Sequence, residues 1–346
     1  MTLVTNGPFP TQNFSFQEGS KFGLLAINNV YSDLPPGSEF QLADGTWVLT
    51  RVPFDADVTW KEWIGTINYE RLKDSNVVLV HSQHSTVPAL LDHEHQTLKK
   101  HVWWTFRLLQ LSGVLEYRGA DLLAGSFFEG RPEVRQLSEL LQFIPSKGYS
   151  RLPVSRERLQ QATELRQRLA EMEATYEFKR ILRGLNALMN VLLQQDGQER
   201  MHQFVRSLEA LILPEAGQTK RQFVHRCQTF ARPGADTQRV LGEAFEMRST
   251  CEHLHDWERS LQSCPQDDRD NVAWQRTRQM ERLASFAYSR ILESPPLHGH
   301  FRNEASQSHF WTVMDDAGRK GIWGGQLDLS AIPIFHEYDQ WGRGCP

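Results

Sequence analysis

The sequence contains an arginine and a histidine in the arrangement Arg-x-x-x-x-His, at Arg248 and His253. Histidine titrates near neutral pH and can move protons, whereas arginine stays charged and can donate two hydrogen bonds to phosphate oxygens. A site that cleaves a phosphodiester without a metal ion needs both groups. The pattern is short, and a solvent-exposed helix face is the better explanation of an isolated match.

The spacing restricts how one helix can present the two side chains. Positions five apart differ by about 140° around a straight helix, so Arg248 and His253 do not share a face. Either the helix ends near His253, or a second element or a second subunit brings the two groups together. The same-face pairs are Arg248 with Glu252 and Ser249 with His253, and the first pair is typical of a surface ion pair.

The stretch lies in a strongly helical region, which extends over 154–293. Ser155 is the expected N-cap of a long helix that continues to Leu192. Gly and Pro separate further amphipathic patterns, which predict helices over 199–213, 219–230, 237–253 and 272–292. Short breaks between long amphipathic helices indicate an antiparallel bundle.

The first half of the chain predicts a different kind of domain. Segments 22–30 and 76–81 are apolar and short, and the pair Asp44-Gly45 between two alternating segments is a hairpin signal. An amphipathic helix is predicted over 88–112, ending at Gly113. Pro, Lys and Gly gather at 146–153, which is the predicted domain boundary.

The fold class predicted from these patterns is α+β. A mixed, strand-weighted N-terminal domain is expected over 1–150, and a helical domain over 151–296. A short β-rich C-terminal segment is expected over 297–346, with strands near 311–314 and 327–335 around a glycine-rich turn.

Composition limits the class of protein. Hydrophobic residues make up 40% and charged residues 23% of the 346 residues, as in a globular protein. We expect no membrane partner and a cytoplasmic location, because no apolar run reaches about 18 residues and no signal pattern is present. The net charge of −4 argues against a basic nucleic-acid binder, although Arg far outnumbers Lys in residues 151–300. That preference is compatible with phosphate recognition, but by itself it favours an Arg-rich genome and salt-bridged helices.

Histidines gather between positions 81 and 101, and imidazole is a common metal ligand. They are His81, His84, His93, His95 and His101. The spacing is poor for a metal site, since no His-x-x-x-His pair occurs there and two of the residues fall on different helix faces. A metal-dependent enzyme is one interpretation of this cluster and a polar helix face is the other. We expect no metal and no cofactor.

The segments from about 175 to 292 resemble the HEPN superfamily of helical domains and, within it, the Apea-like branch. Three features carry the resemblance, in the branch's order and spacing: the stretch SLEAL around Glu209, a helix with the internal Arg226, and the motif Arg-Ser-x-x-x-His at 248–253. Two departures are Ser249, where the branch often has Asn, Asp or His, and Leu254, where Gly is common. The resemblance covers about a third of the chain.

The resemblance implies a metal-independent endoribonuclease that acts on RNA as a homodimer, with the motifs of two subunits facing each other. On this template His253 handles protons at the ribose 2′-hydroxyl or the leaving oxygen, and Arg248 neutralises the scissile phosphate. Ser249 completes the expected catalytic set. A role in host defence or stress is the setting that the resemblance suggests.

Three further positions are expected to bind substrate, of which Glu209 and Arg226 also match the branch. They are Glu252, Arg226 and Glu209, although a buried Glu209–Arg226 ion pair is the structural alternative for two of them. The alternative function is a non-catalytic module that binds RNA or a nucleotide, or that only dimerises.

Overall fold

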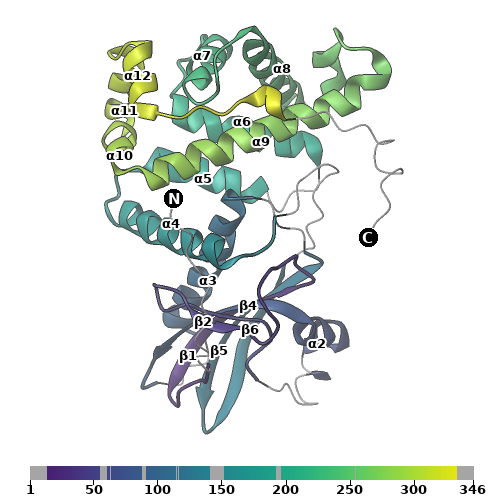
Figure 1. Ribbon diagram of the computed structural model, residues 1–346, viewed down its shortest axis with the longest axis vertical. Helices are drawn as coiled ribbons and strands as arrows, with labels where there is room; N and C mark the ends of the chain where they lie inside the picture. The colour runs from purple at the N-terminus through teal and green to yellow at the C-terminus, as the bar shows by residue number, and fades with distance from the viewer. Residues whose placement is uncertain are drawn as a thin grey trace, which may run out of the picture. The chain divides into compact units, whose positions relative to one another are not determined.

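The computed structural model describes residues 14–54, 61–62, 64–87, 91–113, 115, 117–140, 152–191, 196–253 and 255–332 (Figure 1). The chain divides into two compact units, Met1–Gln167 and Arg168–Pro346, and the division falls inside helix α4 (Arg156–Ala174). The first unit contains a β-sheet and the second is helical, so the α+β class is confirmed. Within the described residues, every helix is too short or too polar to cross a membrane.

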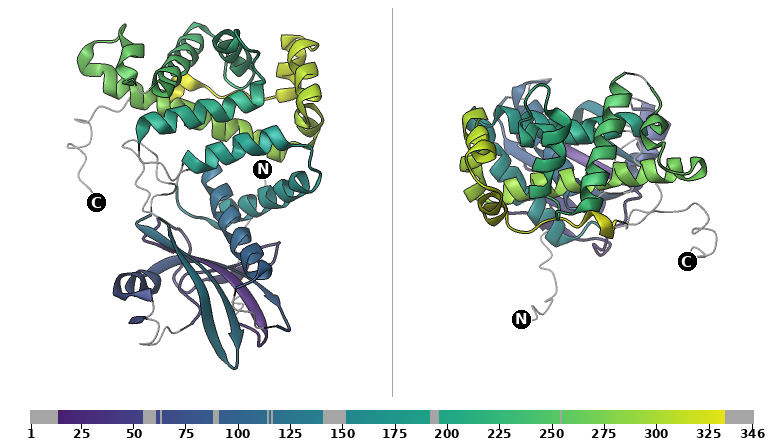
Figure 2. Two further views of the ribbon diagram at one scale, coloured as in Figure 1. Left: turned by 180° about the vertical axis from the view of Figure 1, so that it is seen from behind. Right: turned by 90° about the horizontal axis from the view of Figure 1, so that it is seen from above.

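The first unit is built on a six-stranded antiparallel sheet, whose twist is visible in Figure 2. The strand order is β2-β3-β4-β1-β5-β6. The strands are β1 (Ser20–Asn28), β2 (Glu39–Gln41), β3 (Trp47–Leu49), β4 (Ser75–His84), β5 (Gly119–Phe128) and β6 (Arg131–Leu140). The first strand lies between β4 and β5 and is buried along its whole length, so the first described strand of the chain forms the centre of the sheet.

Alternate residues of β1 face two different layers. Phe22 and Leu24 pack in a cluster with Leu72 of α2 (Thr66–Lys73). On the other face, a Cβ atom at Gly23 would lie 2.4 Å from the backbone of Leu98 in α3 (His93–Leu111). Glycine at this position therefore permits the close approach of α3 to the sheet.

Several predicted elements of the first unit are confirmed. The connection between β2 and β3 contains Gly45 in the left-handed region (φ 87°), as the hairpin signal indicated. Segment 76–81 lies within β4. Helix α3 begins at His93, because Asp92 accepts a hydrogen bond from the backbone N of His95 as the N-cap. Residues 88–90 of the predicted helix and 146–151 of the predicted boundary lie outside the described residues.

In the second unit, α6 (Gly197–Ile212) contacts α5 (Lys179–Val191), α8 (Ala235–Glu252) and α9 (Arg269–Glu293). Its apolar face is fully buried. Tyr288 of α9 donates a hydrogen bond to the carbonyl of Ser207 at 3.0 Å. A Cβ atom at Gly184 would lie 1.9 Å from the Tyr288 hydroxyl, so this glycine lets α5 approach the buried tyrosine.

The predicted long helix from Ser155 to Leu192 is in fact two helices. Ser155 is confirmed as an N-cap, since its hydroxyl accepts from the backbone N of Arg158 at 3.3 Å. Helix α4 ends at Ala174 and α5 begins at Lys179, and between them Tyr176 adopts a left-handed conformation (φ 57°). The break was missed because neither Gly nor Pro marks it.

The prediction of a β-rich segment over 297–346 is wrong for the residues described there. Helices α10 (Pro295–Phe301), α11 (Glu304–Thr312) and α12 (Asp316–Trp323) occupy most of it. The side chains of Asn303 and Asp315 cap the last two helices, a signal that the aromatic content obscured. Of the predicted strand near 327–335, Leu327 forms only an isolated bridge with Ala231, and residues 333–335 lie outside the described residues.

Candidate functional site

The end of α8 separates the two residues of the motif. The helix ends at Glu252, and His253 occupies the C-cap position, where its backbone N lies 3.2 Å from the carbonyl of Thr250. The first of the two geometric alternatives therefore holds within one chain, because the helix ends next to His253. The imidazole is exposed and makes no hydrogen bond or ion pair with any described residue.

Two carboxylates hold the guanidinium of Arg248. Its Nη1 donates to Oε2 of Glu252 at 2.6 Å, and its Nη2 donates to Oε2 of Glu209 at 3.1 Å. Glu252 is one turn along α8, as the same-face spacing predicted, whereas Glu209 belongs to α6. The arginine is 17% exposed, so its orientation is fixed by both helices while part of it still reaches solvent.

Burial disfavours the charged form of Glu209 in this ion-pair cluster. Burial raises the pKa of Glu209, the charge of Arg248 opposes that shift, and the neighbouring charge of Glu252 adds to it. In addition, Oε1 of Glu209 and Nε of Arg248 are buried without a hydrogen-bond partner among the described residues. A ligand with hydrogen-bonding oxygens would therefore meet an arginine whose donors are only partly used.

Arg248 lines a hollow of about 530 Å³ in the helical unit, which we call the motif hollow. Its lining includes Arg180, Glu209, Lys220, Phe245 and Ser249. Arg180 donates to the carbonyls of Ala210 at 3.1 Å and Glu209 at 3.2 Å, and Lys220 pairs with Glu246. Three cations thus face one hollow together with one partly buried carboxylate.

Arg226 is positioned for a structural role. Its Nη1 donates to the carbonyls of Ile212 at 2.8 Å and Leu213 at 2.7 Å, which are the last carbonyls of α6, and its Nη2 lies 3.5 Å from Glu215. Burial lowers the pKa of this guanidinium, and Glu215 opposes the shift. The ion pair considered between Glu209 and Arg226 is therefore not formed, since Arg248 takes the place of Arg226 beside Glu209.

Of the residues predicted for the site, Arg248, Ser249 and Glu209 line the motif hollow together. Glu252 accepts a hydrogen bond from Arg248 but does not itself line the hollow. Arg226 and His253 are not part of its lining either. The two cations that the sequence did not assign are Arg180 and Lys220. Lys220 begins a basic pair just after Gly217 at the start of α7 (Thr219–Arg226), which was a readable signal. The sequence around Arg180 gives no such signal, because Arg180 comes close to Arg248 only through the packing of the helices.

His81 and His101 of the first unit are engaged in packing, whereas His84 and His93 are exposed. The rings of His81 and His101 stack at 3.8 Å, and the Thr46 hydroxyl lies 3.2 Å from Nδ1 of His81 and 3.1 Å from Nε2 of His101. Nε2 of His101 also lies 2.7 Å from Oδ2 of Asp44. Burial, followed by the charge of His101, lowers the pKa of His81 to about 4. No group of three or more potential ligands in the described part of the chain is arranged to hold a metal ion.

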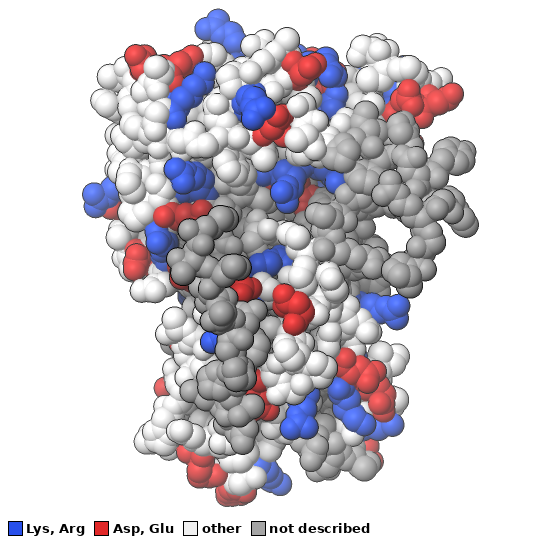
Figure 3. Space-filling view, viewed as in Figure 1, with Lys and Arg blue, Asp and Glu red and all other residues white. Residues whose placement is uncertain are grey.

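On the face drawn in Figure 3, no single region gathers charge of one sign. Lys and Arg side chains are interspersed there with Asp and Glu side chains (Figure 3). This distribution agrees with the small net charge of the chain. Recognition of an anionic polymer would therefore depend on local groups such as those of the motif hollow.

No family model matches the chain, and no match was found among the curated proteins or the solved structures.

Proposed function

We propose that the chain is a metal-independent endoribonuclease that acts as a homodimer through Arg248 and His253. One observation carries the proposal: Arg248 faces a hollow with two further cations, and an exposed histidine ends the same helix five residues later. A hollow lined by cations beside a solvent-accessible imidazole is what cleavage of a phosphodiester requires. The resemblance of segment 175–292 to HEPN domains supports the same reaction.

The proposed reaction uses the ribose 2′-hydroxyl as the nucleophile. One imidazole accepts its proton while the bond from O2′ to phosphorus forms and the bond from phosphorus to O5′ breaks. A second, protonated imidazole gives its proton to the leaving O5′, so the products are a 2′,3′-cyclic phosphate and a 5′-hydroxyl. Each chain has one His253, and pairing two copies about a two-fold axis supplies both the base and the acid.

Arg248 stabilises the negative charge that builds on the phosphate oxygens. Its contact with Glu252 lies near the surface and is worth little, so a phosphate oxygen displaces that carboxylate at low cost. Glu209 keeps its contact from the more buried side and holds the guanidinium in place. Ser249 lies in the lining of the motif hollow, where its hydroxyl can donate to a phosphate oxygen.

A second candidate function is a non-catalytic module that binds RNA or dimerises without turnover. The favouring observation is that two carboxylates already neutralise Arg248, which a binding or structural site tolerates better than a catalytic one. The residues Ser249 and Leu254 also depart from the pattern of the branch. This candidate predicts that RNA is retained and released unchanged.

The test is incubation of the full-length protein with single-stranded RNA, with and without EDTA. If the chain is a metal-independent nuclease, we expect equal cleavage with and without EDTA, and product ends that carry a 2′,3′-cyclic phosphate and a 5′-hydroxyl. Light scattering on the same sample is expected to report a dimer. Cleavage that disappears with EDTA, or intact RNA under all conditions, rejects the proposal.

A further inference from the structure

A second hollow lies beside the motif hollow in the helical unit. It has a volume of about 610 Å³, which is within the range of pockets that hold small ligands, and we call it the α7 hollow. Its lining comes from Gly217 and Gln218 just before α7, from α7 itself, from the short 3₁₀ turn Cys227–Thr229 and from α8. The two hollows share Gly217 and Lys220 in their linings, so one extended ligand can occupy both.

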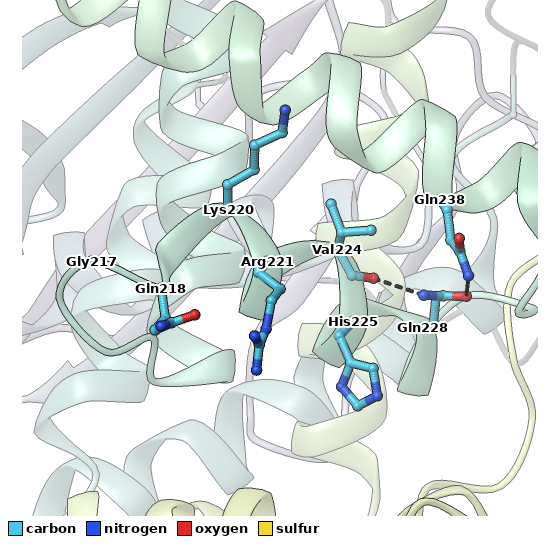
Figure 4. Close-up of a pocket in the computed structure, with 8 residues that line it drawn as sticks. All are labelled: Gly217, Gln218, Lys220, Arg221, Val224, His225, Gln228 and Gln238. Carbon is cyan, nitrogen blue, oxygen red and sulfur yellow. Dashed lines mark hydrogen bonds between the residues drawn. The ribbon is translucent and has the colours of Figure 1, made fainter.

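The α7 hollow carries basic groups and amides, and no carboxylate is among its described lining residues. Arg221 is exposed and makes no hydrogen bond or ion pair with any described residue. His225 extends on the same side of α7 as Arg221 (Figure 4), and its Nε2 lies 3.5 Å from Asp316. Arg221 is therefore the cation of this hollow that can bind an anion without first losing a carboxylate partner.

Two of the lining amides, Gln228 and Gln238, lie together at one end of the lining, whereas Gln218 lies beside Gly217 at the other end (Figure 4). Gln228 is nearly buried, donates to the carbonyl of Val224 at 2.9 Å and accepts a long contact of 3.5 Å from Gln238 (Figure 4). A glutamine amide carries both donors and an acceptor, as the edges of nucleic-acid bases do. A cation at one end and amides at the other match a phosphate and a base, which are the two polar parts of a nucleotide.

We propose that the α7 hollow binds a nucleotide of a single-stranded RNA that lies just beyond those held in the motif hollow around the scissile phosphate. Arg221 contacts the phosphate of that nucleotide, and the amides of Gln228 and Gln238 contact its base. The inference rests on the proposed function, because it takes Arg248 as the position of the scissile phosphate. It adds the direction in which the strand leaves the motif hollow, through the lining shared at Gly217 and Lys220.

The experiment measures binding of 2′-O-methyl oligonucleotides, which lack the nucleophile and cannot be cleaved, to the full-length chain. Short strands of about three nucleotides and long strands of about nine are compared by competition against one labelled long strand. We expect Arg221→Gln to weaken the long strand ~5-fold and to lower its dependence on salt by about one phosphate contact. The short strand is expected to bind equally well, because it fits within the motif hollow.

Two matched variants control for charge and for folding. Arg221→Lys keeps the charge, and we expect it to retain most of the higher affinity that the long strand has over the short strand. Arg259→Gln removes an exposed arginine that lines neither hollow and is expected to change nothing.

Equal binding of the long strand by wild type and Arg221→Gln overturns the inference, as does a wild-type chain that binds no strand. Weakening of short and long strands alike also overturns it, because that pattern indicates a disturbed fold. The proposed function has a separate test. If the chain binds long strands through Arg221 but cuts no RNA, strand binding at the α7 hollow is supported and the nuclease activity is rejected.

Discussion

Two histidines, His95 of the first unit and His253 of the second, are in opposite situations. In the first unit, Nδ1 of His95 lies 2.9 Å from Oδ1 of Asp92, and its Nε2 lies 2.9 Å from the hydroxyl of Ser126. Serine, histidine and aspartate are thus hydrogen-bonded in the order of a nucleophilic triad. In the second unit, His253 has no described partner and stands exposed at the end of α8.

The difference shows that hydrogen-bond geometry is not sufficient for chemistry. His95 is 0% exposed and Ser126 is 1% exposed, so no substrate reaches the serine hydroxyl in this conformation. The buried Lys21 adds a bond of 2.6 Å to Glu94 and a second bond to Asp92, which completes a network that fixes the start of α3 to the sheet. Such a network satisfies buried polar groups, whereas His253 is free to meet a ligand.

Among the substitutions that compare the two units, we expect Arg248→Lys to have the largest effect. Lysine keeps the charge but loses the planar fork that bonds two oxygens, so we expect RNA cleavage to slow by about 100-fold. Initial rates of cleavage measure the effect, and circular dichroism checks that the helical unit stays folded. Arg259→Lys is the control, since that arginine lines neither hollow. Unchanged cleavage in Arg248→Lys removes Arg248 from the reaction.

His95→Ala is the next largest change and acts on stability. It removes two hydrogen bonds and leaves a cavity in a buried site, so the free energy of unfolding is expected to fall by about 3 kcal/mol. Ser126→Ala removes one of these bonds and is expected to cost about 1 kcal/mol. Urea unfolding gives both values. Loss of RNA cleavage in Ser126→Ala without loss of stability would contradict the structural role of His95 and Ser126, because the buried serine would then take part in the reaction.

A smaller effect is the pH dependence of the first unit through His81. The groups that face this ring are His101, Asp44, Arg166 and Thr46. Because its pKa falls from 6.5 to about 4 on folding, the stability from the neutral ring is complete above pH 6.5 and is lost as pH drops toward 4. We expect wild type to lose on the order of 2 kcal/mol over this window and His81→Gln to lose less. Parallel pH profiles of unfolding free energy in the two proteins would exclude His81 as the source.

Local patterns in the sequence predicted much of this molecule. The hairpin at Asp44-Gly45, the cap at Ser155 and the end of the motif helix near His253 each depend on neighbouring residues, and the structure has all three. The motif also identified Arg248 together with its partner Glu252, one helical turn away. Chemistry carried by adjacent residues is readable because a single element positions it.

Features that depend on packing between distant segments were not readable. Arg180 and Lys220 join Arg248 only because α5 and α7 pack near α8, and Glu209 lies 39 positions before its partner Arg248. Ser126 meets His95 across 31 positions, and only the fold brings the two together. The C-terminal helices differ from the sequence prediction for another reason: their aromatic residues favour strands, although Asn303 and Asp315 cap two of the helices.

The most direct test of the account compares two exposed histidines at the end of α8. His253 and His255 are both solvent-exposed and lie two residues apart, so replacing either by alanine disturbs the fold equally little. In EDTA, the account predicts that His253→Ala lowers the first-order rate of RNA cleavage by about 1,000-fold and that His255→Ala leaves it within a factor of about two. Full activity in His253→Ala, or equal losses in both variants, would contradict the claim that the imidazole of His253 moves the proton.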